Sequence, residues 1–230
     1  IQNYTESADM PETPTPVNGD YWWDTANNVL YRYMDGGFRA IGIAANANAW
    51  NGVRALVAGS DSTANDTVIQ YFDITSAGNA ADFGDLTADA KLGSAAGNGS
   101  RVIFAKIARG SSNAMDYVTS STLGNAQDFG DLNYSMDYTG SVSDGSRKVT
   151  GSKDNSGAMG YVAIDTTGNA TSFGSLSTAN WFASNGMACG NDGTKGTFAG
   201  SLNGSSAANE IQYITIQTTG NSTNFGGLSA

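Results

Sequence analysis

Hydrophobic and polar residues alternate in short runs along this chain, and the runs end at small or amide residues. In residues 213–216, two isoleucines fall on one face of an extended segment while Tyr213 and Thr215 fall on the other, which is the periodicity of a β-strand. Asn-Gly and Asp-Gly pairs between such runs supply the positive φ angles of tight hairpin turns. The pattern predicts an all-β protein built from short strands and many turns.

One longer pattern recurs four times. A Tyr is followed seven residues later by the Gly of a Gly-Asn pair, five further on by Phe and three further on by Leu. A recurrence at a fixed period of this size indicates a repeat architecture. The four blocks are residues 71–86, 117–132, 161–176 and 213–228, and their Gly-Asn pairs lie 46, 44 and 52 residues apart.

A second pattern precedes each block: a turn, a basic residue and a short apolar run. The basic residues could form an anion site, make ion pairs or cover apolar surface with their stems. Each repeat thus offers three or four strands, the size of a propeller blade. We therefore predict four repeats of about 46 residues with a β-propeller-like fold. The basic residues are Arg54, Arg101, Arg147 and Lys195.

The last repeat ends shortly after its Phe-Gly pair. Earlier repeats continue into a further strand at residues 91–96 and 138–142, and the fourth has no such continuation. Either residues 41–50 supply that strand and close a ring, or a neighbouring subunit supplies it, or the chain is truncated.

The first 50 residues differ in kind from the repeats. All three prolines lie within residues 11–16, which predicts an extended linker, and residues 19–42 read as an aromatic β-hairpin module. Trp22 and Trp23 are adjacent and must face opposite sides, so one enters the local core and the other is expected to pack against another subunit. We predict two domains: residues 1–50, for attachment or oligomerisation, and residues 51–230, the four-repeat domain.

Charge and composition exclude several classes of function. With 21 acidic and 11 basic residues the net charge is −10, so a nucleic-acid partner is not expected. No stretch reaches the roughly 20 apolar residues of a membrane span, so membrane insertion is not expected. The chain has no His, which removes the usual general base and metal ligand, and the single Cys189 cannot form an internal disulfide. We therefore expect a protein that is not an enzyme and has no catalytic residues.

Two groups of residues are candidates for ligand binding. The first two blocks carry paired carboxylates that could bind calcium, but the other two blocks lack them, so no metal or cofactor is expected and calcium remains an alternative. An insertion in the third unit, between Leu176 and Lys195, carries Asn180, Trp181 and Phe182, and aromatic and amide side chains together suit a sugar ligand. The paired carboxylates are Asp82 with Asp85 and Asp128 with Asp131.

Residues 19–41 resemble a short module of bacteriophage tail and fibre proteins. The blocks with Gly-Asn-Ala-x-x-Phe-Gly-Asp-Leu resemble the kelch-like repeats of phage virion proteins, although the third and fourth blocks depart at the acidic positions. The resemblance implies a location in the virion and a homo-oligomeric fibre or appendage subunit. Such a subunit would present a rigid repeat domain to other virion proteins or to a host-cell glycan. The alternatives are a lectin-like, carbohydrate-binding β-propeller and a capsid decoration protein without a receptor role.

Overall fold

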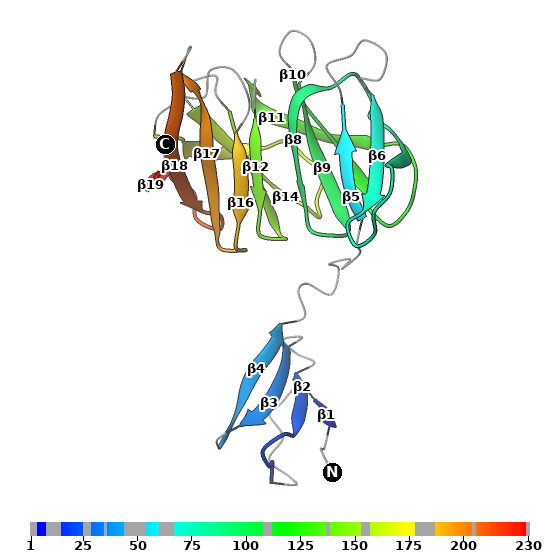
Figure 1. Ribbon diagram of the computed structural model, residues 1–230, viewed down its shortest axis with the longest axis vertical. Coiled ribbons are helices and arrows are strands. Elements are labelled where there is room, and N and C mark those ends of the chain that lie inside the picture. Colours follow the sequence, from blue (N-terminus) through cyan, green and yellow to red (C-terminus); the bar gives the residue numbers. More distant parts are fainter. Residues whose placement is uncertain are drawn as a thin grey trace. The chain divides into compact units, whose positions relative to one another are not determined.

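The structure is a computed structural model of residues 1–230. It describes residues 4–7, 15–24, 29–34, 36–43, 54–59, 67–107, 112–136, 139–152, 157–177, 187–203 and 206–228 (Figure 1). The secondary-structure elements in these ranges are nineteen β-strands, which confirms the all-β prediction. No helix in the same ranges has the length and hydropathy needed to cross a membrane. The chain divides into two compact units, Ile1–Ala49 and Trp50–Ala230.

The first unit is one four-stranded sheet around an aromatic core. Its strands run in sequence order: β1 (Tyr4–Ser7), β2 (Tyr21–Asp24), β3 (Val29–Met34) and β4 (Gly37–Ile43), with β1 parallel to β2 and the other pairs antiparallel. Trp22 is buried, stacked on Tyr31 at 4.8 Å and edge-on to Phe38 at 5.6 Å between ring centroids. Trp23 lies on the opposite face of β2 and is half-buried. Trp22 is therefore the residue that enters the local core, and the packing of Trp23 against another subunit stays a prediction.

The second unit contains four antiparallel sheets, each a simple meander. Sheet 1 is β5 (Arg54–Ala58), β6 (Val68–Asp73) and β7 (Ala81–Asp85). Sheet 2 is β8 (Lys91–Gly97), β9 (Arg101–Ile107), β10 (Ser112–Thr119) and β11 (Gln127–Met136). Sheet 3 is β12 (Gly140–Ser143), β13 (Arg147–Gly151), β14 (Ala158–Ala163) and β15 (Thr171–Ser175). Sheet 4 is β16 (Ala188–Asn191), β17 (Lys195–Asn203), β18 (Ser206–Thr215) and β19 (Thr223–Gly227).

The sheet boundaries fall one strand away from the boundaries of the sequence repeats. The strand after each Phe-Gly-x-Leu segment begins the next sheet, because the chain crosses from sheet to sheet just after the Leu, as between Leu86 and β8. Sheet 4 therefore has four strands, and the strand that the fourth repeat lacks would begin a further sheet. Among the described residues, sheet 1 has three strands. Of residues 41–50, the segment predicted to supply a missing strand, residues 41–43 belong to β4 of the first unit and residues 44–50 lie outside the described residues.

The first strands of sheets 2, 3 and 4 lie side by side. The middle one, β12, contacts both β8 and β16 (Figure 1). Small hydroxyl side chains join β8 to β12: Ser94 shares hydrogen bonds with Thr139 at 2.8 Å and with Ser141 at 2.7 Å. Sheets 2 and 3 are thus connected through polar contacts at this edge, while the apolar side chains lie between the sheet faces.

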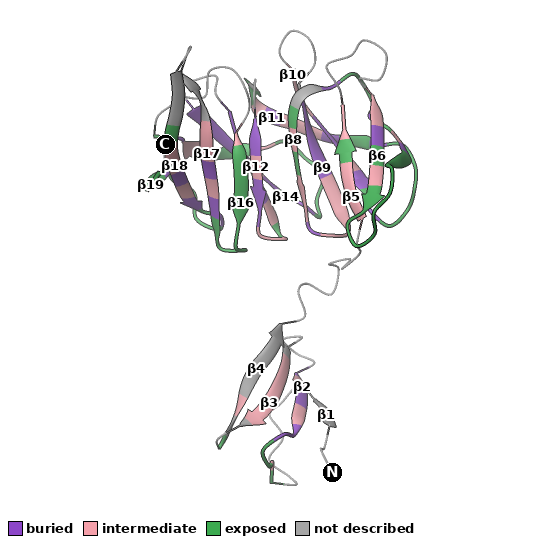
Figure 2. Ribbon diagram, in the orientation of Figure 1, coloured by how far each residue is buried: buried purple, intermediate pink, exposed green. Residues whose placement is uncertain are grey.

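Three apolar clusters fill the spaces between neighbouring sheets. The cluster between sheets 1 and 2 includes Phe83 and Val118, that between sheets 2 and 3 includes Phe129 and Ile164, and that between sheets 3 and 4 includes Phe173 and Ile216. Figure 2 shows buried positions on strands of all four sheets. No sheet therefore has a core of its own, since the buried apolar side chains lie between neighbouring sheets, as expected for stacked repeats.

Candidate functional site

The predicted glycan-contact residues cannot be placed. Asn180, Trp181 and Phe182 lie outside the described residues, and their contact with a sugar stays a prediction. Of the paired carboxylates, Asp82, Asp85 and Asp128 are exposed and Asp131 is half-buried. The described part of the chain holds no group of three or more acidic, His or Cys residues arranged to bind a metal ion.

The Gly-Asn pair of the second, third and fourth blocks binds the edge of the preceding sheet. The amide of Gly124 donates to the carbonyl of Phe83 at 2.8 Å, and the amide of Ala126 donates to the carbonyl of Asp85 at 2.8 Å. The side-chain oxygen of Asn125 accepts a hydrogen bond from the amide of Asp85 at 3.1 Å. Three hydrogen bonds thus add the Gly-Asn-Ala segment of sheet 2 to the outer strand of sheet 1.

The same three hydrogen bonds recur at the next two junctions, with distances of 2.7–3.0 Å. Asparagine serves this position because it offers an acceptor oxygen at the end of a short side chain. The sequence identified the Gly-Asn pair as the end of a strand, but the structure gives it a second role as a connector between sheets. The donors are Gly168 and Ala170, then Gly220 and Ser222; the asparagines are Asn169 and Asn221.

The Gly of each Phe-Gly pair lets two sheets approach closely. At Gly130 a Cβ atom would come within 2.6 Å of the carbonyl carbon and oxygen of Gly168, and Gly130 has a φ of 131°. The Cβ atoms of Gly84 and Gly174 would overlap the backbones of Gly124 and Gly220 in the same way. The ladder shifts register at each of these Phe residues, so a β-bulge accompanies the close approach of the two backbones.

The recurring basic residue also joins neighbouring sheets. The Arg101 guanidinium lies over the ring of Tyr117 in its own sheet, 4.3 Å from the centroid, and donates to the carbonyl of Ile164 in the next sheet at 2.9 Å. Arg54 and Arg147 repeat both contacts. These arginines therefore make a cation–π contact in their own sheet and a hydrogen bond to a carbonyl of the next sheet.

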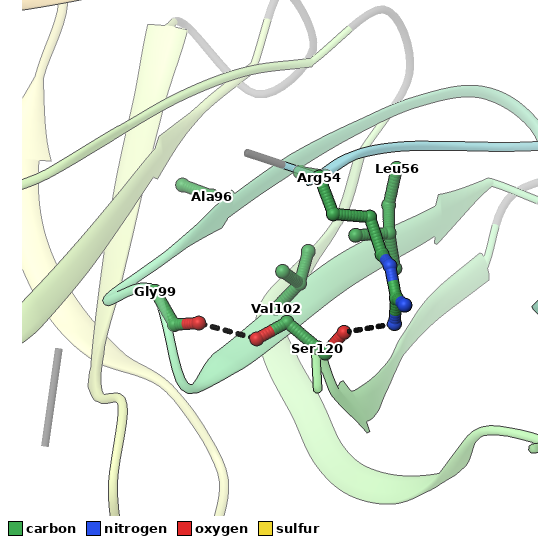
Figure 3. Close-up of a pocket in the computed structure, with 7 residues that line it drawn as sticks. Arg54, Leu56, Ala96, Gly99, Val102 and Ser120 are labelled. Carbon is green, nitrogen blue, oxygen red and sulfur yellow. Dashed lines mark hydrogen bonds between the residues drawn. The ribbon is translucent and has the colours of Figure 1, made fainter. Parts of the chain in front are cut away.

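A cavity of about 230 Å³ lies at the junction of sheets 1 and 2 (Figure 3). Figure 3 shows the Arg54 guanidinium donating to the Ser120 carbonyl, and the Ser120 hydroxyl bonded to the carbonyl of Gly99. The residues equivalent to Ser120 in sheets 3 and 4 are Ile164 and Ile216, both fully buried. A small polar residue thus stands beside this cavity, where sheets 3 and 4 have a branched apolar one.

Two lysines are buried in sheets 2 and 3, and sequence reasoning did not single them out. Lys106 pairs with Asp116 at 2.8 Å, and the Asp116 carboxylate also accepts from the Thr87 amide and hydroxyl. Lys148 donates to the Thr150 hydroxyl at 2.5 Å, and burial lowers its pKa to about 7. The signal for Lys148 was its place directly after Arg147, where the other repeats have Ala55, Val102 and Gly196.

Fold and junctions together define a class, an all-β protein in which four sheets are joined by one repeated interface. No family model matches the chain, and no curated protein sequence matches it. Among solved structures, the structure of YjhT is similar, with a TM-score of 0.58 and 9% sequence identity. The match covers 79% of this chain and 64% of that chain, so this chain spans less than two thirds of the other protein's length. At this identity the likeness concerns the fold alone.

Proposed function

We propose that this protein is a non-enzymatic structural subunit of a bacteriophage virion, a fibre or appendage protein. The observation that carries the proposal is that the recurring residues make the contacts between neighbouring sheets. The Gly-Asn, Phe-Gly and basic positions join one sheet to the next through hydrogen bonds, close backbone contact and cation–π contacts. Repeated positions that serve packing rather than chemistry suit a domain whose role is to hold a fixed shape.

In this proposal the second unit is a β-propeller-like array in which each sheet is a blade. The contacts of β12 with β8 and β16 support that arrangement, because the first strands of successive blades lie nearest the axis of a propeller. A rigid array fixes the positions of the loops between strands, so that many weak contacts with a host surface or with virion proteins act together.

The first unit would attach the array to other subunits. Its aromatic core around Trp22 makes it a separate folded module, and the half-buried Trp23 on the other face of β2 is the residue expected to contact a partner. The resemblance of residues 19–41 to phage tail and fibre modules favours attachment to another virion protein as its role.

Analysis of purified phage particles tests the proposal. We expect mass spectrometry to find the chain in the particles, and a cryo-electron microscopy map to place it in an appendage. Fab fragments against residues 54–227 should then block adsorption to host cells. Absence from purified particles would contradict the proposal, while a position on the capsid with no effect on adsorption would favour the decoration role.

Two binding and activity assays separate the remaining classes. Incubation with host polysaccharide should release no product, because the recurring positions of the chain serve the sheet junctions rather than chemistry. Release of oligosaccharides would contradict the non-enzymatic assignment. Tight binding on a glycan array, lost in the Trp181→Ala variant, would favour the lectin-like function.

A further inference from the structure

The outer face of sheet 4 exposes the apolar residues that are buried at every other junction. Phe225 is 60% exposed and Leu228 is 47% exposed. Their equivalents in sheets 1 to 3 are buried against the following sheet. We call this surface, with Gly226 beside it, the tail face. The buried equivalents are Phe83, Phe129 and Phe173 for Phe225, and Leu86, Leu132 and Leu176 for Leu228.

The opposite end of the array exposes the complementary set. Ile74 is 67% exposed and Val57 is 55% exposed, and Phe72 is also exposed. Ala55 pairs with Phe72 and Val57 with Gln70 across β5 and β6, so Val57 and Phe72 share one face of sheet 1. We call the surface of Val57, Phe72 and Ile74 the head face. Its equivalents in sheets 2 and 4 are buried against the preceding sheet: Phe104, Val118 and Ser120, then Phe198, Ile214 and Ile216.

The backbone groups that form each internal junction have equivalents at both ends of the array, and these equivalents contact no further sheet among the described residues. A Cβ on Gly226 would meet nothing within 4 Å, whereas Gly84, Gly130 and Gly174 each lie against the Gly-Asn pair of the next sheet. At the head face, no hydrogen bond of the junction type links Gly78 or Ala80 to a described residue. In Figure 2, β19 at one end of the array is coloured as exposed.

We propose that the tail face of one chain binds the head face of a second copy of the same chain. The three internal junctions show what covers each face: a surface built like the tail face packs on a surface built like the head face. One copy carries both halves of that interface and leaves both uncovered. Because the two faces differ, the contact is heterologous, and copies joined in this way form a ring or extend into a filament.

The internal junctions also predict the atoms that meet. By equivalence with Gly124 and Phe83, the Gly78 amide of one copy donates to the Phe225 carbonyl of the other. The Lys195 ammonium, which lies over the Tyr213 ring at 5.0 Å, takes the place of the arginines that donate to the next sheet. Its acceptor is then the carbonyl of Ile74 in the second copy, the position equivalent to Ile164. This inference does not depend on where the protein acts, so it stands or fails separately from the virion proposal.

A mixing experiment with two single variants tests the inference. Ile74→Asp places a carboxylate on the head face and Phe225→Asp places one on the tail face; both residues are exposed in the isolated chain, so folding should be retained. The full chain should self-associate in sedimentation velocity, and each variant alone should be monomeric or weaken association at least about tenfold. Leu123→Asp, at another exposed aliphatic residue, is the matched control and should associate like the parent chain.

An equimolar mixture of the two variants distinguishes this mode from other dimers. Ile74→Asp retains an intact tail face and Phe225→Asp an intact head face, so the mixture should form a 1:1 dimer and nothing larger. A monomeric parent chain at all concentrations would overturn the inference. Association that neither variant weakens, or two variants that stay monomeric when mixed, would also overturn it. Thermal melting of each variant confirms that the fold is intact.

Discussion

The glycine in each Phe-Gly pair is required for two separate reasons. Its φ lies between 131° and 152° in all four blocks, a region that side chains rarely occupy. In the first three blocks its Cα also lies against the backbone of the next sheet, where no Cβ fits. The fourth block has the backbone conformation without the close contact, so the chain itself provides a control.

We expect Gly130→Ala to destabilise the protein more than Gly226→Ala. Both variants strain the backbone, at a cost of about 1–3 kcal/mol. Only Gly130→Ala also forces the Cβ against the Gly168 backbone, which should add about 1–3 kcal/mol. Urea unfolding of monomeric protein, with the Ile74→Asp background to prevent association, measures the difference. Equal losses would show that the close approach of sheets 2 and 3 does not contribute.

Lys148 should make stability depend on pH above neutrality. Burial lowers its pKa from 10.5 to about 7 in the folded state, so between these values the unfolded chain binds more protons. The free energy of unfolding should therefore rise with pH, by about 1.4 kcal/mol per pH unit in that window, and this contribution should be constant below pH 7. The Lys148→Met variant should lack this contribution. The difference in free energy of unfolding between the two proteins should therefore change with pH by that slope. Parallel pH profiles from 7 to 10 would contradict this assignment.

At the scale of elements, the second strand of sheets 2 and 3 begins with the residue that ties that sheet to the next one. Arg101 at the start of β9 contacts Tyr117 in β10 and reaches the turn after β14 in sheet 3. Lys195 at the start of β17 makes the equivalent tyrosine contact in sheet 4. The turns that lead into β9, β13 and β17 share a further device, in which an Asn or Asp side chain accepts from the backbone two and three residues later.

We expect Arg101→Met to destabilise the chain by about 2 kcal/mol and Lys195→Met by less than about 1 kcal/mol. Methionine keeps an apolar stem over the tyrosine in both cases. Only the arginine variant loses a charge-assisted hydrogen bond to a carbonyl of the next sheet. Thermal denaturation of both variants in the Ile74→Asp background provides the comparison. A larger loss for Lys195→Met would show that the tyrosine contact, and not the junction, sets the energy.

The sequence predicted the strands and turns better than it predicted the contacts between sheets. Period-two alternation and Asn-Gly turns fix strands and hairpins through neighbouring residues, so the all-β class and the four blocks followed from local pattern. The role of Asn125 depends on the Asp85 amide 40 residues away, and no local pattern contains that partner. The sheet boundary after Leu86 was also not predicted. A sequence repeat can begin at any strand of the structural unit, so the repeat alone does not show where one sheet ends. The predicted site residues Asn180, Trp181 and Phe182 lie outside the described residues and stay predictions.

At the scale of the whole molecule, the second unit is an array with one interface used three times inside the chain and left open at both ends. Its apolar clusters lie between sheets, so the exposed Phe225 and Ile74 are the ends of a pattern rather than isolated surface residues. Stability should therefore be lowest in sheets 1 and 4, each of which is covered on one face only.

Amide hydrogen exchange followed by NMR tests this description most directly. In dilute monomeric protein, the amides of Gly124, Gly168 and Gly220 should be protected, because each donates to the preceding sheet, and the equivalent amide of Gly78 should exchange freely. At concentrations where the chain associates, Gly78 should become protected, and it should stay exposed in Phe225→Asp. Rapid exchange at all four glycines, or protection of Gly78 in the monomer, would contradict the assignment of the Gly-Asn pair as the connector between sheets.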